Sequence, residues 1–85
     1  MATNASITIS SIKAFRDMLA DSVERNNRAK NERYSKAEAY FDAGLEDLAQ
    51  QSKAFADSWG ARERQVANLL KCFEMLFKEE LEEEL

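Results

Sequence analysis

Residues 35–60 read SKAEAYFDAGLEDLAQQSKAFADSWG, and the spacing of their apolar side chains decides the fold class. At alternating intervals of four and three residues, this stretch carries Phe41, Leu45, Leu48, Ser52, Phe55 and Trp59. A repeat of 3.5 residues is the seam of left-handed helix packing. The stretch therefore predicts an amphipathic helix that packs against another helix.

Three local features predict where this helix begins and ends. Residues 35–38 (SKAE) have the Ser-x-x-Glu form of a capping box, in which the hydroxyl and the carboxylate satisfy reciprocal backbone amides. Gly60 follows Trp59, where a left-handed helix terminus favours glycine, so we expect a turn over residues 58–61. Gly44 falls inside the helix at a cost of about 1 kcal/mol relative to alanine, which predicts a close helix contact there.

A further amphipathic helix is predicted on each side of this stretch. The first carries, at helical spacing, Ile12, Phe15, Leu19 and Val23, with Met18 at the edge. The last carries Val66, Leu69, Leu70, Phe73, Leu76 and Phe77. This last set covers roughly half the helix circumference, more than the ~100° stripe of an ordinary surface helix. We therefore expect a homodimer or a partner protein to cover part of it.

The sequence thus predicts an all-α fold, with residues 1–85 as a single helical domain. A small antiparallel three-helix bundle would have helices at roughly 9–25, 35–59 and 61–82. The alternative is a helical hairpin, in which a long helix 10–59 folds against a shorter one at Gly60. Either form could be dimeric.

The segments outside these helices are polar. We expect residues 1–8 to be a short lead. Residues 79–85 are expected to fray, because their glutamates oppose the macrodipole at a helix C-terminus. Residues 24–34 offer almost nothing to bury, and the sequence leaves open whether they form a loop or continue a helix.

The core is predicted to contain one phenylalanine from each helix, Phe15, Phe55 and Phe73. Trp59 is in phase with Phe55 and is expected to join them. Cys72 lies on the apolar side of its helix and is expected to be a small core residue.

The composition argues against catalysis and against cofactor or metal binding. The chain has no histidine, no glycine-rich phosphate loop and no base near its single cysteine. Residues 79–84 lack the turn that would bring carboxylates onto one cation. A net charge of −4 disfavours broad attraction to nucleic acid or membranes, and no stretch approaches the ~20 apolar residues of a bilayer span. One thiol and no signal peptide indicate a cytoplasmic protein.

The function that remains is protein binding, as an adaptor, an assembly chaperone or a small inhibitor that covers a partner surface. The candidate contacts are the six apolar residues of the last helix and an acidic surface formed by Asp42, Glu46 and Asp47. Such an acidic surface would suit a basic partner, including one that itself binds nucleic acid.

Direct nucleic-acid binding through residues 25–36 is the alternative function. The candidate phosphate contacts are Arg25, Arg28, Lys30, Arg33 and Lys36, and Tyr34 could stack on a base. In the three-helix arrangement, however, the acidic end of the chain would lie beside this segment and partly neutralise it.

Overall fold

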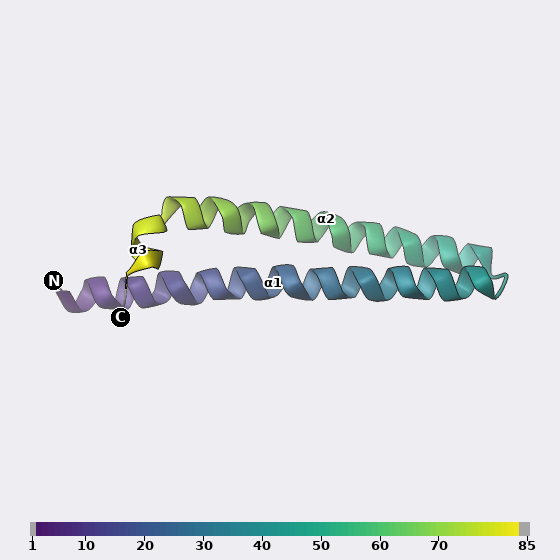
Figure 1. Cartoon of the computed structure of the whole chain (residues 1–85), viewed down its shortest axis with the longest axis horizontal. Coiled ribbons are helices and arrows are strands. Elements are labelled where there is room, and N and C mark those ends of the chain that lie inside the picture. The colour runs from purple at the N-terminus through teal and green to yellow at the C-terminus, as the bar shows by residue number, and fades with distance from the viewer. Residues whose placement is uncertain (1, 84–85) are drawn as a thin grey trace.

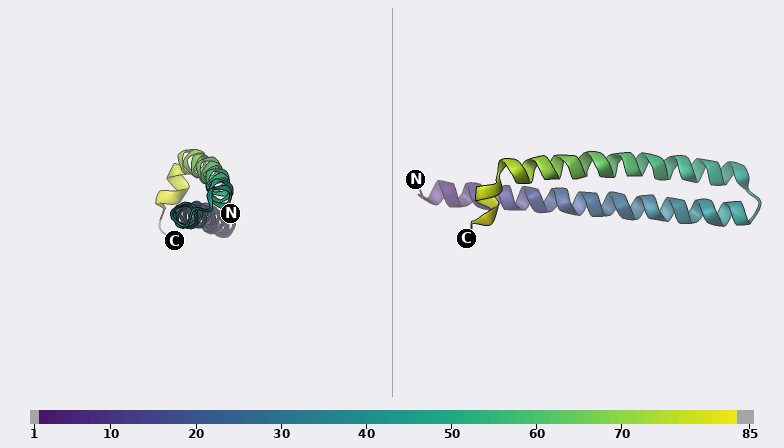
Figure 2. Two further views of the ribbon diagram at one scale, coloured as in Figure 1. Left: turned by 90° about the vertical axis from the view of Figure 1, so that its right-hand side faces the viewer. Right: turned by 45° about the horizontal axis from the view of Figure 1, so that its top comes forward.

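The protein is an elongated helical hairpin in this computed structural model (Figure 1). The structure describes the backbone of residues 2–83 and the side chains of residues 9–83. Helix α1 spans Ala2–Asp42, α2 spans Glu46–Leu76 and the short α3 spans Lys78–Glu82. Helices α1 and α2 run antiparallel, and α3 turns back toward α1 at the open end (Figure 2). The molecule measures 65 × 17 × 15 Å.

The all-α prediction is confirmed, since residues 2–83 contain helices and no strand. The packing is mainly between α1 and α2, so the fold is the hairpin alternative and not the three-helix bundle. The position of the bend differs from the predicted one.

The chain reverses at residues 43–45 and not at residues 58–61. Gly44 has φ +79°, a left-handed conformation that favours glycine. The backbone N–H of Leu45 donates to the carbonyl of Tyr40 at 2.8 Å, and that of Gly44 donates to Phe41 at 3.0 Å. These two bonds form a Schellman motif, which satisfies carbonyls at the end of α1.

Gly60 lies in the middle of α2, buried against α1. A Cβ atom added there would lie 3.3 Å from the side-chain Cδ of Lys30. Gly60 therefore marks the close helix contact and Gly44 marks the turn, the reverse of the sequence-based prediction.

Helix α1 continues through the expected lead at residues 1–8, as far as it is described, and through residues 24–34, which the sequence left open as a loop or a helix. Residues 2–8 and residues 24–34 are helical, and residues 35–38 do not begin a new helix. Neither proline nor glycine interrupts residues 2–42. Two ion pairs at i,i+4 spacing, Asp21 with Arg25 and Glu24 with Arg28, support the polar part of α1.

Small side chains form the contact between the two long helices. The face of α2 that is buried against α1 consists of Ala49, Ser52, Ala56 and Gly60. Among residues 9–83, the only buried apolar side chains are Leu19, Ala49 and Ala56. Leu48 and Phe55 are exposed beside this stripe, so the predicted packing of Leu48 against another helix and the predicted core position of Phe55 are wrong.

Aromatic rings close the open end of the hairpin. The ring centroids of Phe15 and Phe73 are 5.1 Å apart, and those of Phe73 and Phe77 are 4.8 Å apart. Phe55 does not join this cluster and instead lies under the Arg33 guanidinium, 5.3 Å from its ring centre.

Three other core predictions need correction. Phe15 is exposed although its ring packs against Phe73, Trp59 is only half-buried, and Cys72 is exposed.

The acidic end of the chain lies beside the beginning of α1 and not beside residues 25–36. The Lys13 ammonium donates a hydrogen bond to the carbonyl of Glu83. Part of the segment expected to fray is helical, since α3 spans Lys78–Glu82; residues 84–85 lie outside the described residues.

The two glycines give a direct test of this fold. Gly44→Ala should lower the free energy of unfolding by about 1–2 kcal/mol, because alanine is strained at positive φ. Gly60→Ala should leave it unchanged or raise it, because the gain in helix propensity of about 1 kcal/mol offsets a small shift of the Lys30 side chain. Gly60→Leu should lower it.

Urea unfolding followed by circular dichroism at one protein concentration measures all three variants. A fold that bends at Gly60 predicts the opposite order for the two alanine variants.

Candidate protein-binding surfaces

One side of α2 is almost free of charge. We define the α2 sector as the thirteen positions 48, 51, 54, 55, 58, 61, 62, 65, 68, 69, 72, 75 and 76, all of which are exposed. At seven residues per two turns, the repeat of packed helices, they cover roughly a third of the helix circumference. Arg62 is the sole charged residue among them, although 33% of the chain is charged. Depletion of charge is typical of the centre of a protein interface.

Large apolar side chains follow a line along this sector. Leu48, Phe55, Leu69 and Leu76 are separated from one another and from Arg62 by multiples of seven residues. Seven residues correspond to two turns of a packed helix, so the four side chains share one line. Their exposed fractions run from 42% at Leu48 to 75% at Leu76.

The line continues onto α1 at the open end. Phe73 lies one helical turn from both Leu69 and Leu76, and its ring packs against that of Phe15. Phe15 and Met18, one turn further along α1, are also exposed. The apolar surface thus extends across both long helices.

The structure divides the six apolar residues that the sequence marked as a partner-binding face. Four of them are half-buried, namely Val66, Leu70, Phe73 and Phe77, whereas Leu69 and Leu76 are exposed. Sequence reasoning missed Leu48 and Phe55 as surface residues. Their seven-residue spacing, with uncharged Gln51, Ser58 and Gln65 beside them, was the signal that could have found them.

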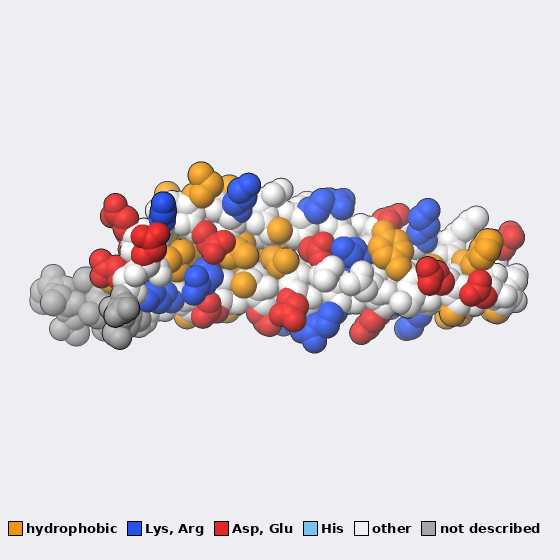
Figure 3. Space-filling model, in the orientation of Figure 1, with side chains coloured by type: hydrophobic (Ala, Val, Ile, Leu, Met, Phe, Trp, Pro, Cys, Tyr) orange, Lys and Arg blue, Asp and Glu red, His pale blue; other side chains and the backbone are white. Residues whose placement is uncertain are grey.

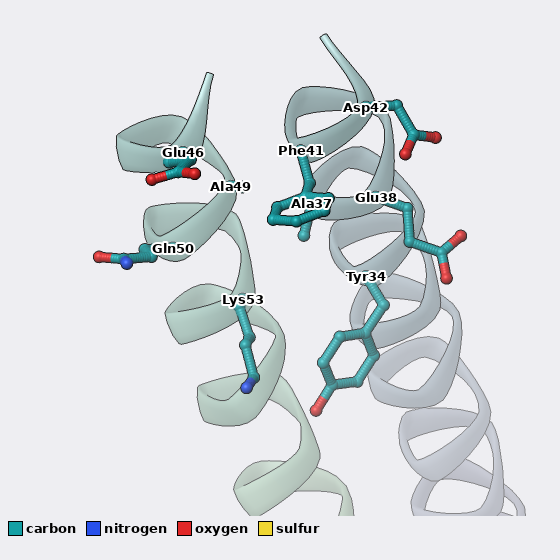
Figure 4. Close-up of a pocket in the computed structure, with 9 residues that line it drawn as sticks. All are labelled: Tyr34, Ala37, Glu38, Phe41, Asp42, Glu46, Ala49, Gln50 and Lys53. Carbon is teal, nitrogen blue, oxygen red and sulfur yellow. The ribbon is translucent and has the colours of Figure 1, made fainter. Parts of the chain in front are cut away.

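A second surface lies near the turn (Figure 4). This turn groove has a volume of about 700 Å³, and its apolar lining is Tyr34, Ala37, Phe41 and Ala49. Figure 4 shows Phe41 and Tyr34 projecting into the space between the helices, while Glu38 and Asp42 point away from α2. Phe41 is 65% exposed.

The predicted acidic surface lies at this end of the hairpin. Asp42 and Glu46 border the turn groove, and Asp47 lies with Gly44 and Leu45 on the outer side of the turn. The structure therefore brings the three carboxylates to one end of the molecule, around exposed Phe41 and Leu45.

The five basic residues of the alternative site do not form one free patch. Lys30 turns toward α2 and donates to Glu63 Oε1 at 3.1 Å, and Arg33 covers Phe55. Arg25 and Arg28 pair with acidic residues one turn earlier in α1, and Lys36 is exposed. Lysine and arginine alternate with aspartate and glutamate along the face in Figure 3.

A tyrosine from the turn groove links the two long helices. The Tyr34 hydroxyl donates to Asp57 Oδ1 at 2.6 Å. This hydrogen bond, together with desolvation and the negative charge of Asp57, raises the pKa of Tyr34 above its ordinary value, while Arg64 acts in the opposite direction.

None of the described helices is long and apolar enough to cross a membrane. The described part of the chain holds no group of three carboxylate, histidine or cysteine side chains that could bind a metal ion. No protein-family model, curated protein or solved structure significantly matches this chain.

Because of the hydrogen bond from Tyr34 to Asp57, the free energy of unfolding should decrease at alkaline pH. A raised pKa means that folding favours the protonated phenol, so this contribution is complete below about pH 10 and is lost as pH rises through the folded-state pKa. Ultraviolet absorbance of tyrosinate in a Tyr40→Phe background should show Asp57→Asn lowering the pKa of Tyr34. An unchanged titration would contradict this assignment.

Proposed function

We propose that the chain is a non-catalytic protein–protein interaction module that binds through the α2 sector. The observation that supports this most directly is the exposed line of Leu48, Phe55, Leu69 and Leu76 in a sector with a single charge. Such a module acts as an adaptor, an assembly chaperone or an inhibitor that covers a partner surface. We place it in the cytoplasm, on the grounds of its single thiol.

Burial of apolar side chains alone supplies a favourable free energy of binding at this sector. Fully burying a leucine or phenylalanine side chain contributes about 1.5–3 kcal/mol, and the line offers four of them. Because the sector has one charged side chain, its desolvation costs little in unpaired charge. A partner helix laid along the line would gain contacts over its whole length.

The turn groove supports a second contact in the same complex. Carboxylates around exposed Phe41 favour a partner with basic and apolar side chains, because opposite charges speed association and exclude competing partners. Direct nucleic-acid binding has less support, since Arg25, Arg28, Lys30 and Arg33 are already engaged by acidic or aromatic groups.

The test is affinity capture with the full chain from the cells that express it, followed by mass spectrometry. Leu69→Glu should abolish capture of the partner, because a carboxylate would lie within the apolar line. Lys71→Glu is the matched control: it adds a glutamate two residues away, on the charged side of α2, and should retain the partner. Circular dichroism verifies that both variants remain helical.

Capture of the same proteins by both variants at wild-type yield would contradict the proposed site. Loss of the partner in Phe41→Glu as well would assign the turn groove to the same complex.

A further inference from the structure

We propose that the α2 sector is covered by a second copy of this chain, packed antiparallel about a twofold axis near Arg62. This inference rests on the proposed function and names the partner. Two hairpins joined in this way form a four-helix assembly.

The first support is the surface area of the chain. The protein exposes 6472 Å², whereas a compact monomer of 9.7 kDa exposes about 5,100 Å². If two copies each buried this excess of about 1,400 Å², they would share an interface of about 2,800 Å², which is typical of permanent homodimers. The few buried apolar side chains of one hairpin agree with a core that is completed by a second copy.

The second support is the symmetry of the apolar line about its midpoint. Leu48 and Leu76 lie fourteen residues before and after Arg62, and Phe55 and Leu69 lie seven residues before and after it. In a twofold interface, residue i meets residue j and j meets i. Antiparallel pairing centred on Arg62 therefore sets Leu48 against Leu76 of the other copy, and Phe55 against Leu69.

The pairing extends along most of the hairpin. From Leu48 to Leu76 the line is about 42 Å long, at 1.5 Å per residue. Every large apolar side chain on it meets another one across the axis. A shift in register by two turns would place Phe55 or Leu69 opposite Arg62.

Arg62 gives this arrangement a distinctive property. Two guanidinium groups approach each other at the axis, each held over its own Trp59 ring at 4.8 Å. Like charges repel, so removal of this charge strengthens self-association. Removal of the Arg62 charge would instead weaken the binding of an acidic foreign partner.

Sedimentation equilibrium of the full chain tests the assembly. The wild type should have twice the chain mass of 9.7 kDa, Phe55→Glu and Leu69→Glu should be monomeric, and Lys71→Glu should remain dimeric. Arg62→Gln should lower the dissociation constant by roughly tenfold. A monomeric wild type at the highest concentration, or glutamate variants that stay dimeric, would overturn the proposal.

The axis has its own test. In a Cys72→Ser background, Arg62→Cys should form an intermolecular disulfide on mild oxidation, because equivalent residues meet at a twofold axis, whereas Lys71→Cys should not. A dimer without the Arg62→Cys crosslink would overturn the twofold pairing.

The outcomes also separate this inference from the function on which it rests. If the wild type is monomeric but Leu69→Glu loses a captured protein, the second copy is wrong and the protein-binding function stands. If the wild type is monomeric and captures nothing, both are wrong.

Discussion

The close approach of α1 and α2 is the constraint on which the rest of the structure depends. At Ala49, Ser52, Ala56 and Gly60, α2 has little or no side chain, so it can pack tightly against α1. Helices in such contact leave no space between them for leucine or phenylalanine, and the larger side chains lie at the flanks. The hairpin is therefore narrow, has a small core and exposes the apolar line of the α2 sector.

The fold class could be predicted from the sequence, but the position of the bend could not. Helical periodicity and the absence of proline predict helices whether the chain bends at Gly44 or at Gly60. Glycine, however, serves both at a positive φ and at a close contact, and its identity alone does not distinguish Gly44 from Gly60. The candidate site could not be predicted for a related reason. Leu48 and Ala49 are neighbours on the helix, and periodicity alone does not show which of them faces α1. The close contact has room only for the smaller side chain, so Ala49 is buried and Leu48 is exposed.

Polar side chains in the middle of the hairpin link α1 to α2. Lys30 reaches across to Glu63, and their half-buried side chains fix the two helices at one level along their axes. Arg33, which sequence reasoning assigned to a phosphate-binding segment, covers Phe55 instead. Lys30 and Arg33 thus hold the two helices together. A partner that binds only the folded hairpin would add to its stability by mass action.

The central claim, that α2 continues unbroken through Gly60, is tested most directly by a distance between two spin labels on α2. Native Cys72 is exposed and can carry one label, and Asp47→Cys can carry the other. Pulsed electron resonance on protein diluted with unlabelled chain should give about 37 Å, the length of 25 helical residues. A separation near 10 Å, the distance between adjacent packed helices, would mean that the chain bends at Gly60 and would contradict the hairpin described above.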